Sequence, residues 1–314
     1  MEKNKSLQNF NTENPLVSII MPVFNAGRFL VGALDSVLKQ TYENWELIAV
    51  DDASSDNSFL ILQHYANFDN RIKVFKNIRN LGVSKTANFA VSQSKGEFIA
   101  RMDADDIMYP ERIRGQTGFL LRNPRVIVVG GQVKLIDESG KKLGDKRFPL
   151  EHKKIYEMLY TAMPVQQGAM LVKRTALPKN FEWYNGVRVA EEVKLFFRLI
   201  RFGEFANLPT VVLEYRQYPQ STSLRDPKST FRVTYNARKE AVKKYGYKPS
   251  LKSHILSYMQ YLFTLFLPAP FIYPMFMLYR KMFHLTDRAV VKNAKTVYHN
   301  IERALVKPAL NYGL

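Results

Sequence analysis

The chain contains no cysteine, which excludes disulfide-stabilised folds and thiolate metal sites. A metal ion bound to these 314 residues has to use oxygen or imidazole ligands. The first fifteen residues are polar and lack the apolar run of a secretory signal, so we expect the N-terminal domain to stay in the cytoplasm.

Acidic residues become scarce toward the carboxyl terminus. From residue 226 onward the chain has 15 Lys or Arg residues and four Asp or Glu residues, and this segment supplies most of the formal net charge of +18. A basic segment favours an anionic partner, either nucleic acid or lipid headgroups. Because these basic residues flank an uncharged aromatic stretch and form no recognisable nucleic-acid-binding motif, we expect a lipid surface and no nucleic acid.

Short apolar runs alternate with helical patterns in the first hundred residues. Residues 17–23, 45–50, 72–75 and 97–102 are typical of buried strands, and amphipathic segments lie between them. Each crossover between parallel strands needs a helix to return the chain to the same edge. The pattern therefore predicts an α/β fold with a parallel sheet.

Aspartate residues follow two of these predicted strands. Asp51 and Asp52 end the second strand, while Asp103, Asp105 and Asp106 follow the fourth. The carboxyl ends of parallel strands meet at one edge, where ligands bind. Crowded carboxylates repel one another, and a divalent cation with oxygen ligands is the usual compensation. Capping and turn formation are the alternative, but one cap does not require the sequence MDADD, so we favour a ligand site.

Four separated blocks match a known family in order and spacing. They read VSIIMPVFNAGRFL, SVLKQTYENWELIAVDDASSD, NLGVSKTAN and GEFIARMDADDIMYPERI, and the similarity extends from about residue 17 to about residue 223. The chain resembles the family 2 inverting glycosyltransferases of the GT-A fold, of the type that makes bacterial polysaccharides or lipid-linked glycans. The resemblance implies a mostly parallel mixed sheet flanked by helices. The expected organisation is a polar tail (1–15), a catalytic domain (16–225) and a basic, aromatic-rich helical segment (226–314).

The resemblance also implies a pocket for the nucleoside of a sugar donor. The residues expected to line it are Pro22, Val23, Asn25, Asp51 and Asp52. One of the two Asp carboxylates would accept a hydrogen bond from the ring N–H of a uracil-type base. The expected donor is therefore a UDP-sugar.

A second group of residues is expected at the diphosphate of the donor. By resemblance, Asp105 would bind Mn²⁺ or Mg²⁺, and Asp103 would contact the metal or the ribose. Such a cation stabilises the negative charge that develops on the leaving diphosphate. Arg112 and Arg216 would reach the phosphates, with structural pairing as the alternative for each.

The acceptor side of the reaction needs a base, because an inverting enzyme must take a proton from the attacking hydroxyl. In the family this base is the Asp of a Glu-Asp pair that precedes an apolar helix, and the matching stretch here is VAEEVKLFFRL. The base would be Glu192, with Glu191 beside it. Alternatively, both carboxylates simply stabilise a helix N-terminus. Gln167 and Tyr218 occupy two positions where the family often has histidine, so contacts there are expected to differ.

The carboxy-terminal segment contains 25 consecutive residues without a charge, from 255 to 279. Its length suffices to cross a bilayer, but Pro268, Pro270 and Pro274 would break a straight helix, and basic residues stand on both sides. We expect a broken helix or re-entrant hairpin in the cytoplasmic leaflet. The alternative is packing against the catalytic domain or a second subunit.

These observations predict a metal-dependent enzyme at the inner face of the cell membrane. It would move a sugar from a UDP-sugar to a hydroxyl of a polyprenyl-linked glycan or polysaccharide acceptor. The alternative is a non-catalytic nucleotide-sugar-binding relative, which the glutamate at 192 and the two missing histidines would suit.

Overall fold

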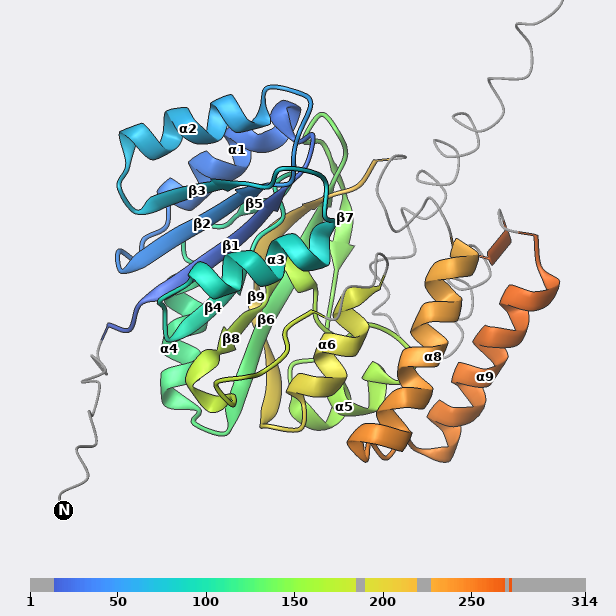
Figure 1. Cartoon of the computed structure of the whole chain (residues 1–314). Coiled ribbons are helices and arrows are strands. Elements are labelled where there is room, and N and C mark those ends of the chain that lie inside the picture. Colours follow the sequence, from blue (N-terminus) through green and yellow to red (C-terminus); the bar gives the residue numbers. More distant parts are fainter. Residues whose placement is uncertain (1–13, 185–189, 219–226, 269–270, 273–314) are drawn as a thin grey trace, which may run out of the picture.

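The computed structural model describes residues 14–184, 190–218, 227–268 and 271–272, which form a mixed β-sheet with helices on both faces (Figure 1). The strands lie in the order β3-β2-β1-β4-β8-β6-β9-β5, and β7 pairs with β6 outside this path. The predicted α/β class is confirmed, and the sheet is mixed.

The first half of the sheet is parallel, as the alternating pattern predicted. Its strands are β1 (Val17–Val23), β2 (Trp45–Asp51), β3 (Ile72–Lys76) and β4 (Phe98–Arg101). The helices between them are α1 (Gly27–Leu38), α2 (Ser58–Phe68) and α3 (Val83–Gln93). Because β1 pairs in parallel with both β2 and β4, the carboxyl ends of all three strands meet at one edge.

The second half of the sheet contains antiparallel pairs. Its strands are β5 (Ile107–Met108), β6 (Val126–Ile136), β7 (Lys142–Lys146), β8 (Leu171–Lys173) and β9 (Glu204–Arg216). The accompanying helices are α4 (Arg112–Arg122), α5 (His152–Leu159) and α6 (Glu191–Leu199). β8 runs antiparallel to β4 and β6, whereas the long strands β6 and β9 are parallel.

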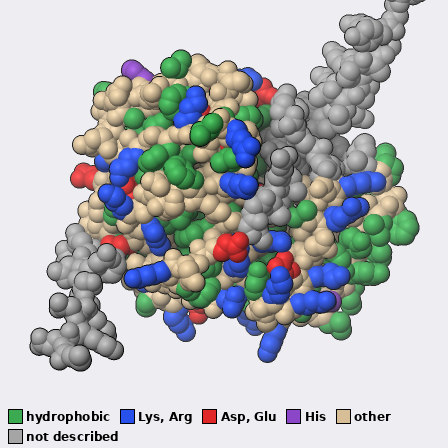
Figure 2. Space-filling view, in the orientation of Figure 1, with side chains coloured by type: hydrophobic (Ala, Val, Ile, Leu, Met, Phe, Trp, Pro, Cys, Tyr) green, Lys and Arg blue, Asp and Glu red, His purple; other side chains and the backbone are tan. Residues whose placement is uncertain are grey.

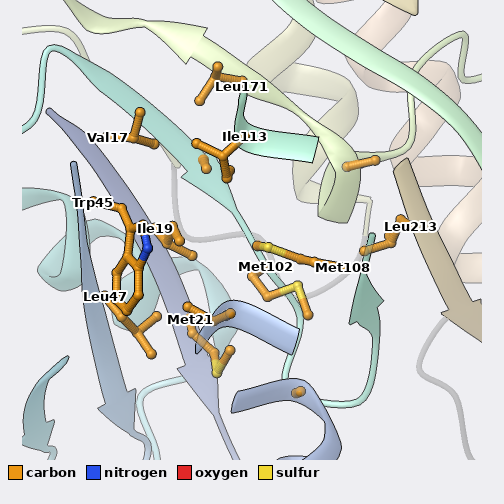
Figure 3. Packing of buried hydrophobic residues seen from close by; sticks show 14 of the residues in the cluster. Val17, Ile19, Met21, Trp45, Leu47, Met102, Met108, Ile113, Leu171 and Leu213 are labelled. Atoms are coloured by element: carbon orange, nitrogen blue, oxygen red, sulfur yellow. The ribbon is translucent and has the colours of Figure 1, made fainter. Parts of the chain in front are cut away.

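Two hydrophobic clusters lie on the two faces of the sheet. One packs β1 and β2 against α1, α2 and α4, and Figure 3 shows Val17, Ile19 and Met21 of β1 in it, together with Ile113 of α4. The other packs the opposite side chains of β1 and β2 against α3, α5, α6 and α8. The alternation of side chains along β1 thus buries both faces of the strand, which explains its continuous apolar sequence.

Two helices follow the sheet, α8 (Pro227–Tyr245) and α9 (Leu251–Phe266). α9 ends two residues before Pro268, so the predicted interruption of the apolar segment is confirmed at that proline. Among the described residues, no helix combines the length and the hydropathy that a bilayer crossing requires. The predicted hairpin over 255–279 lies partly outside the described residues, which stop at 272.

Candidate active site

The aspartates predicted to share one edge of the sheet do so. Asp51 is the last residue of β2, and Asp103 follows β4 by two residues, with β1 lying between the two strands. β9 adds Arg216, its last residue, to the same region, since the Arg216 backbone N–H donates to Asp106 Oδ1 at 2.9 Å. The edge therefore combines acidic side chains from loops that lie far apart in the sequence.

The neighbouring carboxylates of Asp51 and Asp52 have different environments. Asp52 accepts hydrogen bonds from the backbone N–H groups of Leu81 and Gly82, both at 2.8 Å, and from the side chain of Asn77 at 2.7 Å. Asp51 accepts one from the Ser54 N–H at 3.1 Å, and its buried Oδ1 has no partner among the described residues. Asp52 therefore orders the loop before α3, whereas one buried oxygen of Asp51 could still accept a hydrogen bond.

The loops after β1 and β2 are tied together by Asn25. This residue has a positive φ of 48°, a conformation that asparagine tolerates better than most residues. Its backbone N–H donates to Ser54 Oγ at 3.0 Å, and its Oδ1 accepts from the Ser55 N–H at 2.9 Å. Asn25 thus holds the shape of the predicted nucleoside pocket.

The last two residues of β1 differ in what they can contribute to this pocket. Pro22 is half-buried, whereas Val23 is 1% exposed and its side chain belongs to the core. The Val23 carbonyl accepts from the Asp52 N–H at 2.7 Å. The predicted donor contact of Val23 is therefore not available to its side chain, because that side chain points into the sheet packing.

Asp103 is held by the buried Arg101 at the end of β4. The Nε and Nη2 groups of Arg101 donate to Asp103 Oδ1 at 3.0 and 2.7 Å. The other carboxylate oxygen faces Gly168, where an added Cβ would come within 2.9 Å of it. Arg101 therefore fixes the orientation of Asp103, and the missing side chain of Gly168 leaves room for the other oxygen.

Asp105 and Asp106 lie at the end of β9 as well as near Asp103. The Tyr218 hydroxyl donates to Asp105 Oδ2 at 2.9 Å. Burial raises the pKa of Asp105, the charge of Asp103 raises it further, and the Tyr218 hydrogen bond opposes the shift. Burial and then the charges of Asp105 and Asp103 raise the pKa of Asp106 well above its ordinary value. The three carboxylates thus form an electrostatically strained group.

This acidic group fits one kind of metal site. No group of three His, Cys, Asp or Glu side chains in the part of the chain that the structure describes is arranged to hold a metal ion. Mg²⁺ in nucleotide enzymes commonly takes one or two carboxylates and completes its shell with phosphate oxygens and water. The crowding of Asp103 and Asp105 suits a cation that binds together with a diphosphate. Asp106 Oδ2 is buried and has no partner among the described residues.

Arg112 lies beneath the acidic group rather than in a position to reach phosphates. It is 1% exposed, and its Nη2 donates to the carbonyls of Arg101 at 2.8 Å and Met170 at 3.3 Å. Burial lowers its pKa to about 9, which Asp106 and Asp103 oppose. These contacts correct the predicted phosphate contact, because the guanidinium joins two backbone segments and faces the buried side of the aspartates.

Arg216 binds the loops around the site through backbone carbonyls. Its Nε donates to the Asp105 carbonyl at 2.9 Å, and its Nη1 donates to the carbonyls of Asp137 at 2.8 Å and Glu138 at 3.1 Å. The guanidinium also lies 4.7 Å from the centre of the Phe29 ring. Of the two predicted roles, these contacts describe the structural one, although Arg216 stands next to Asp105.

The two glutamates of the predicted base begin α6. Ala190 precedes them with φ 53° and ψ 34°, a left-handed conformation that sets the direction in which the helix starts. Glu191 is buried, and burial followed by the charge of Glu192 raises its pKa to about 8. Burial and the charge of Asp103 raise the pKa of Glu192, which Lys146 and Arg101 lower. The negative charge of Asp103 therefore raises the pKa of both glutamates.

Sequence reasoning missed three contributors to the site. Tyr218 was noted only for replacing a histidine, Arg101 was not singled out, and Gly168 carried no signal of its own. The sequence shows an arginine next to MDADD. It does not show that two nitrogens of Arg101 donate to Asp103, because this pairing depends on the side-chain conformation. Gln167, at the second histidine position, donates to the Tyr184 hydroxyl at 3.3 Å.

Comparisons with known proteins identify the family of the chain. A family model described as "Glycosyl transferase family 2" matches residues 18–181. An uncharacterized glycosyltransferase of Haemophilus influenzae is 31% identical over 218 residues, which are 67% of this chain and 68% of that protein. The Escherichia coli protein WfgD, named as a UDP-Glc:alpha-D-GlcNAc-diphosphoundecaprenol beta-1,3-glucosyltransferase, is 42% identical over 108 residues, 34% of this chain and 42% of its own length.

A solved structure shares the fold. Residues 1–349 of TarS from S. aureus, in complex with UDP-GlcNAc, superpose with a TM-score of 0.61 and 20% identity, covering 80% of this chain and 72% of that one. The likeness at this identity concerns the fold. Since the family model covers just over half of the chain and a relative above 30% identity is matched over two thirds of its length, the chain belongs to glycosyl transferase family 2.

Proposed function

We propose that this glycosyltransferase moves a sugar from a UDP-sugar to a hydroxyl of a lipid-linked glycan or polysaccharide, with inversion at the transferred carbon. The observation that carries the proposal is that the carboxylates of α6 lie close enough to Asp103 for its charge to raise their pKa values. WfgD, whose name includes a UDP-sugar donor and a lipid diphosphate acceptor, supports the choice of donor and acceptor. The non-catalytic alternative remains a measurable outcome.

The nucleoside end of the donor would lie along the loops after β1 and β2. Oδ1 of Asp51, which has no donor among the described residues, is suited to accept from the ring N–H of uracil, because a buried carboxylate oxygen without a donor is costly. Pro22 and Asn25 would shape the pocket around the base. Asp52 would act indirectly, by holding the backbone of Leu81 and Gly82 in place.

The diphosphate end would lie at the acidic group. Asp105, with Asp103 beside it, would hold Mn²⁺ or Mg²⁺, and that cation would supply charge stabilisation to the leaving diphosphate. Arg101 would keep Asp103 in a fixed orientation, since its fork takes one carboxylate oxygen and leaves the other facing Gly168. Tyr218 would orient Asp105 in the same way.

The acceptor hydroxyl would lose its proton to Glu192. A base with a raised pKa suits this task, because proton transfer is most effective when the pKa approaches the working pH. We also propose that transfer takes place at the cytoplasmic face of the cell membrane, where a lipid-linked acceptor is presented.

A panel of nucleotide sugars, assayed for hydrolysis and transfer with and without Mn²⁺, tests the proposal. Transfer from a UDP-sugar that requires metal and is lost in Asp105→Asn is the expected result, because the amide keeps the shape of the carboxylate and removes its charge. Donor binding without turnover on any acceptor would favour the non-catalytic relative. Metal-dependent transfer that is unchanged in the Asn variant would remove Asp105 from the metal site.

A further inference from the structure

The polarity of helix α9 is inverted with respect to the protein core. A surface helix normally turns its apolar stripe inward. Along α9 the buried side chains are largely polar, and they are Ser253, Ser257, Gln260 and Thr264, each at most 7% exposed. The exposed side chains of α9 are Lys252, His254 and six apolar ones. The six apolar residues are Leu251, Ile255, Tyr258, Met259, Leu265 and Phe266, which are 39–81% exposed. We call these six residues the outer face of α9.

Hydrogen bonds fix which side of α9 faces the protein. Arg238 of α8 donates to Ser257 Oγ at 3.2 Å and to Gln260 Oε1 at 2.7 Å. The Gln260 amide donates in turn to the carbonyl of Thr161 at 3.0 Å, and the Ser253 hydroxyl donates to that of Glu157 at 3.4 Å. Because these buried polar groups are satisfied where they lie, rotating the helix to hide its apolar side would leave them without partners.

A basic stripe runs beside the outer face. Lys228, Arg232, Tyr235 and Lys239 recur at helical spacing on α8. The Tyr235 ring stacks on Tyr261 of α9 with centroids 4.2 Å apart, and Lys239 lies 5.7 Å from the Tyr235 ring. The stripe is therefore on the side of α8 next to α9, and Figure 2 shows Lys and Arg side chains beside the hydrophobic surface there.

The charge around the outer face is almost entirely of one sign. Residues 227–268 contain eight Lys or Arg residues and one acidic residue, Glu240. That glutamate is paired with Lys194 at 2.9 Å and with Lys244 at 3.1 Å. A second copy of the chain would bring two basic stripes together, which like-charge repulsion opposes. An anionic surface with an apolar layer beneath it complements both features.

We propose that the outer face of α9 docks on an anionic membrane surface, with the basic stripe of α8 on the lipid phosphates. Apolar side chains of this kind enter the boundary between headgroups and acyl chains, and the helix lies in the plane of the membrane. α8 starts nine residues after Tyr218, which contacts Asp105. The inference builds on the proposed membrane location and is independent of the proposed chemistry.

Vesicle sedimentation of the full chain tests the apolar contribution. Binding to phosphatidylcholine vesicles that contain phosphatidylglycerol should be strong, and the double variant Ile255→Glu, Phe266→Glu should lose most of it. These side chains are 54% and 81% exposed, so the variant should fold normally. The matched control is Leu60→Glu, Phe68→Glu on α2, where the side chains are 68% and 81% exposed; it should bind like the wild type.

The charge contribution has its own pair of variants. Replacing Lys228, Arg232 and Lys239 by Gln should weaken binding on the order of 10²-fold, since each basic residue near an anionic surface contributes about a fivefold change in affinity. Replacing Lys39, Lys95 and Arg125 by Gln removes the same charge elsewhere and should cost much less. High salt should weaken vesicle binding of the wild type in the same way, because it screens these charges.

Several outcomes would overturn the docking proposal. Equal binding to neutral vesicles would exclude an anionic surface as the specific partner. Binding that survives the α9 variant but disappears after truncation at residue 272 would place the contact in the segment after that residue. If sedimentation showed a dimer that dissociates in the α9 variant, the partner of the outer face would be a second copy of the chain. UDP affinity, measured on the same variants, should stay unchanged, so a failure of the docking proposal is distinguishable from a failure of the proposed chemistry.

Discussion

The hydroxyl of Tyr218 donates a hydrogen bond to Oδ2 of Asp105 across 2.9 Å, while its ring lies 5.5 Å from that of Phe29. Tyr218→Phe keeps the ring and removes the bond. We expect roughly a tenfold loss in metal-dependent donor affinity, because a hydrogen bond to a charged group contributes about 1.5 kcal/mol. Calorimetry with UDP and Mn²⁺ measures it. Tyr65→Phe, which loses the 2.6 Å bond to Asp35 away from the site, should keep wild-type affinity.

Asp51 and Asp52 should respond differently to the same substitution. Asp51→Asn replaces Oδ1, which has no partner in the described part of the chain, by a group that cannot accept, so UDP affinity should fall while thermal stability changes little. Asp52→Asn disturbs three hydrogen bonds and should lower the free energy of unfolding by about 1–3 kcal/mol. UDP titration and thermal melting of both variants separate the two effects. If Asp52→Asn alone abolished UDP binding without loss of stability, the assignment would be reversed.

Glu192→Gln should keep donor affinity and lose transfer by about 10²- to 10⁴-fold, the usual contribution of a positioned base. Glu191→Gln is the matched control and should cost less, because two consecutive helical residues cannot both face one acceptor hydroxyl. Glu192→Asp restores the family residue, and we expect slower transfer because the shorter arm changes the geometry. Full activity of Glu192→Gln would exclude this residue as the base.

The stability of the protein should depend on pH through Glu191. Its pKa in the folded protein is about 8, above its ordinary value, so the folded state binds a proton that the unfolded state releases. Stability should therefore fall as pH rises from about 5 to about 8, by at most roughly 1.4 kcal/mol per pH unit. Glu191→Gln should flatten this part of the curve. Glu111→Gln, whose side chain is 70% exposed, should not.

Gly168→Ala should impair catalysis more than folding. The new Cβ would come within 2.9 Å of Asp103 Oδ2 and 3.1 Å of Asp106 Oδ2, so the acidic group must shift. A displacement of about an ångström can cost up to 10²-fold in rate. Gly32→Ala on α1 has no atom within 4 Å of the new Cβ and serves as control. Kinetics of the two variants, with melting curves alongside, would show whether the close approach matters.

Local pattern was enough to predict the parallel half of the sheet. Alternating strands and helices put Asp51 and Asp103 at one edge, since connected parallel strands leave few alternatives. The antiparallel strand β8 is only three residues long, and its pairing with β4 and β6 depends on contacts distant in sequence. Patterns of a few residues do not determine such contacts.

The acidic positions of the site could be predicted, but not the partners of individual side chains. Nothing in the sequence distinguishes the Asp51 carboxylate from that of Asp52, because the difference arises from a loop near Leu81 that folds back onto one of them. Arg112 was misplaced for a similar reason. Its position after the MDADD sequence suggested phosphates, whereas the start of α4 turns it under the strands.

The burial of Arg112 has a consequence for how the fold balances the charges of its acidic edge. The Arg112 guanidinium lies close to Asp106 and Asp103 inside the protein. Unlike a bound metal ion, this positive charge is part of the chain and stays in place when a chelator is added. The acidic edge thus carries a permanent counter-ion of its own, and assembly of the fold does not have to wait for a cation from the cell. Under the proposed metal-dependent mechanism, removal of the metal would then stop sugar transfer and leave the fold in place.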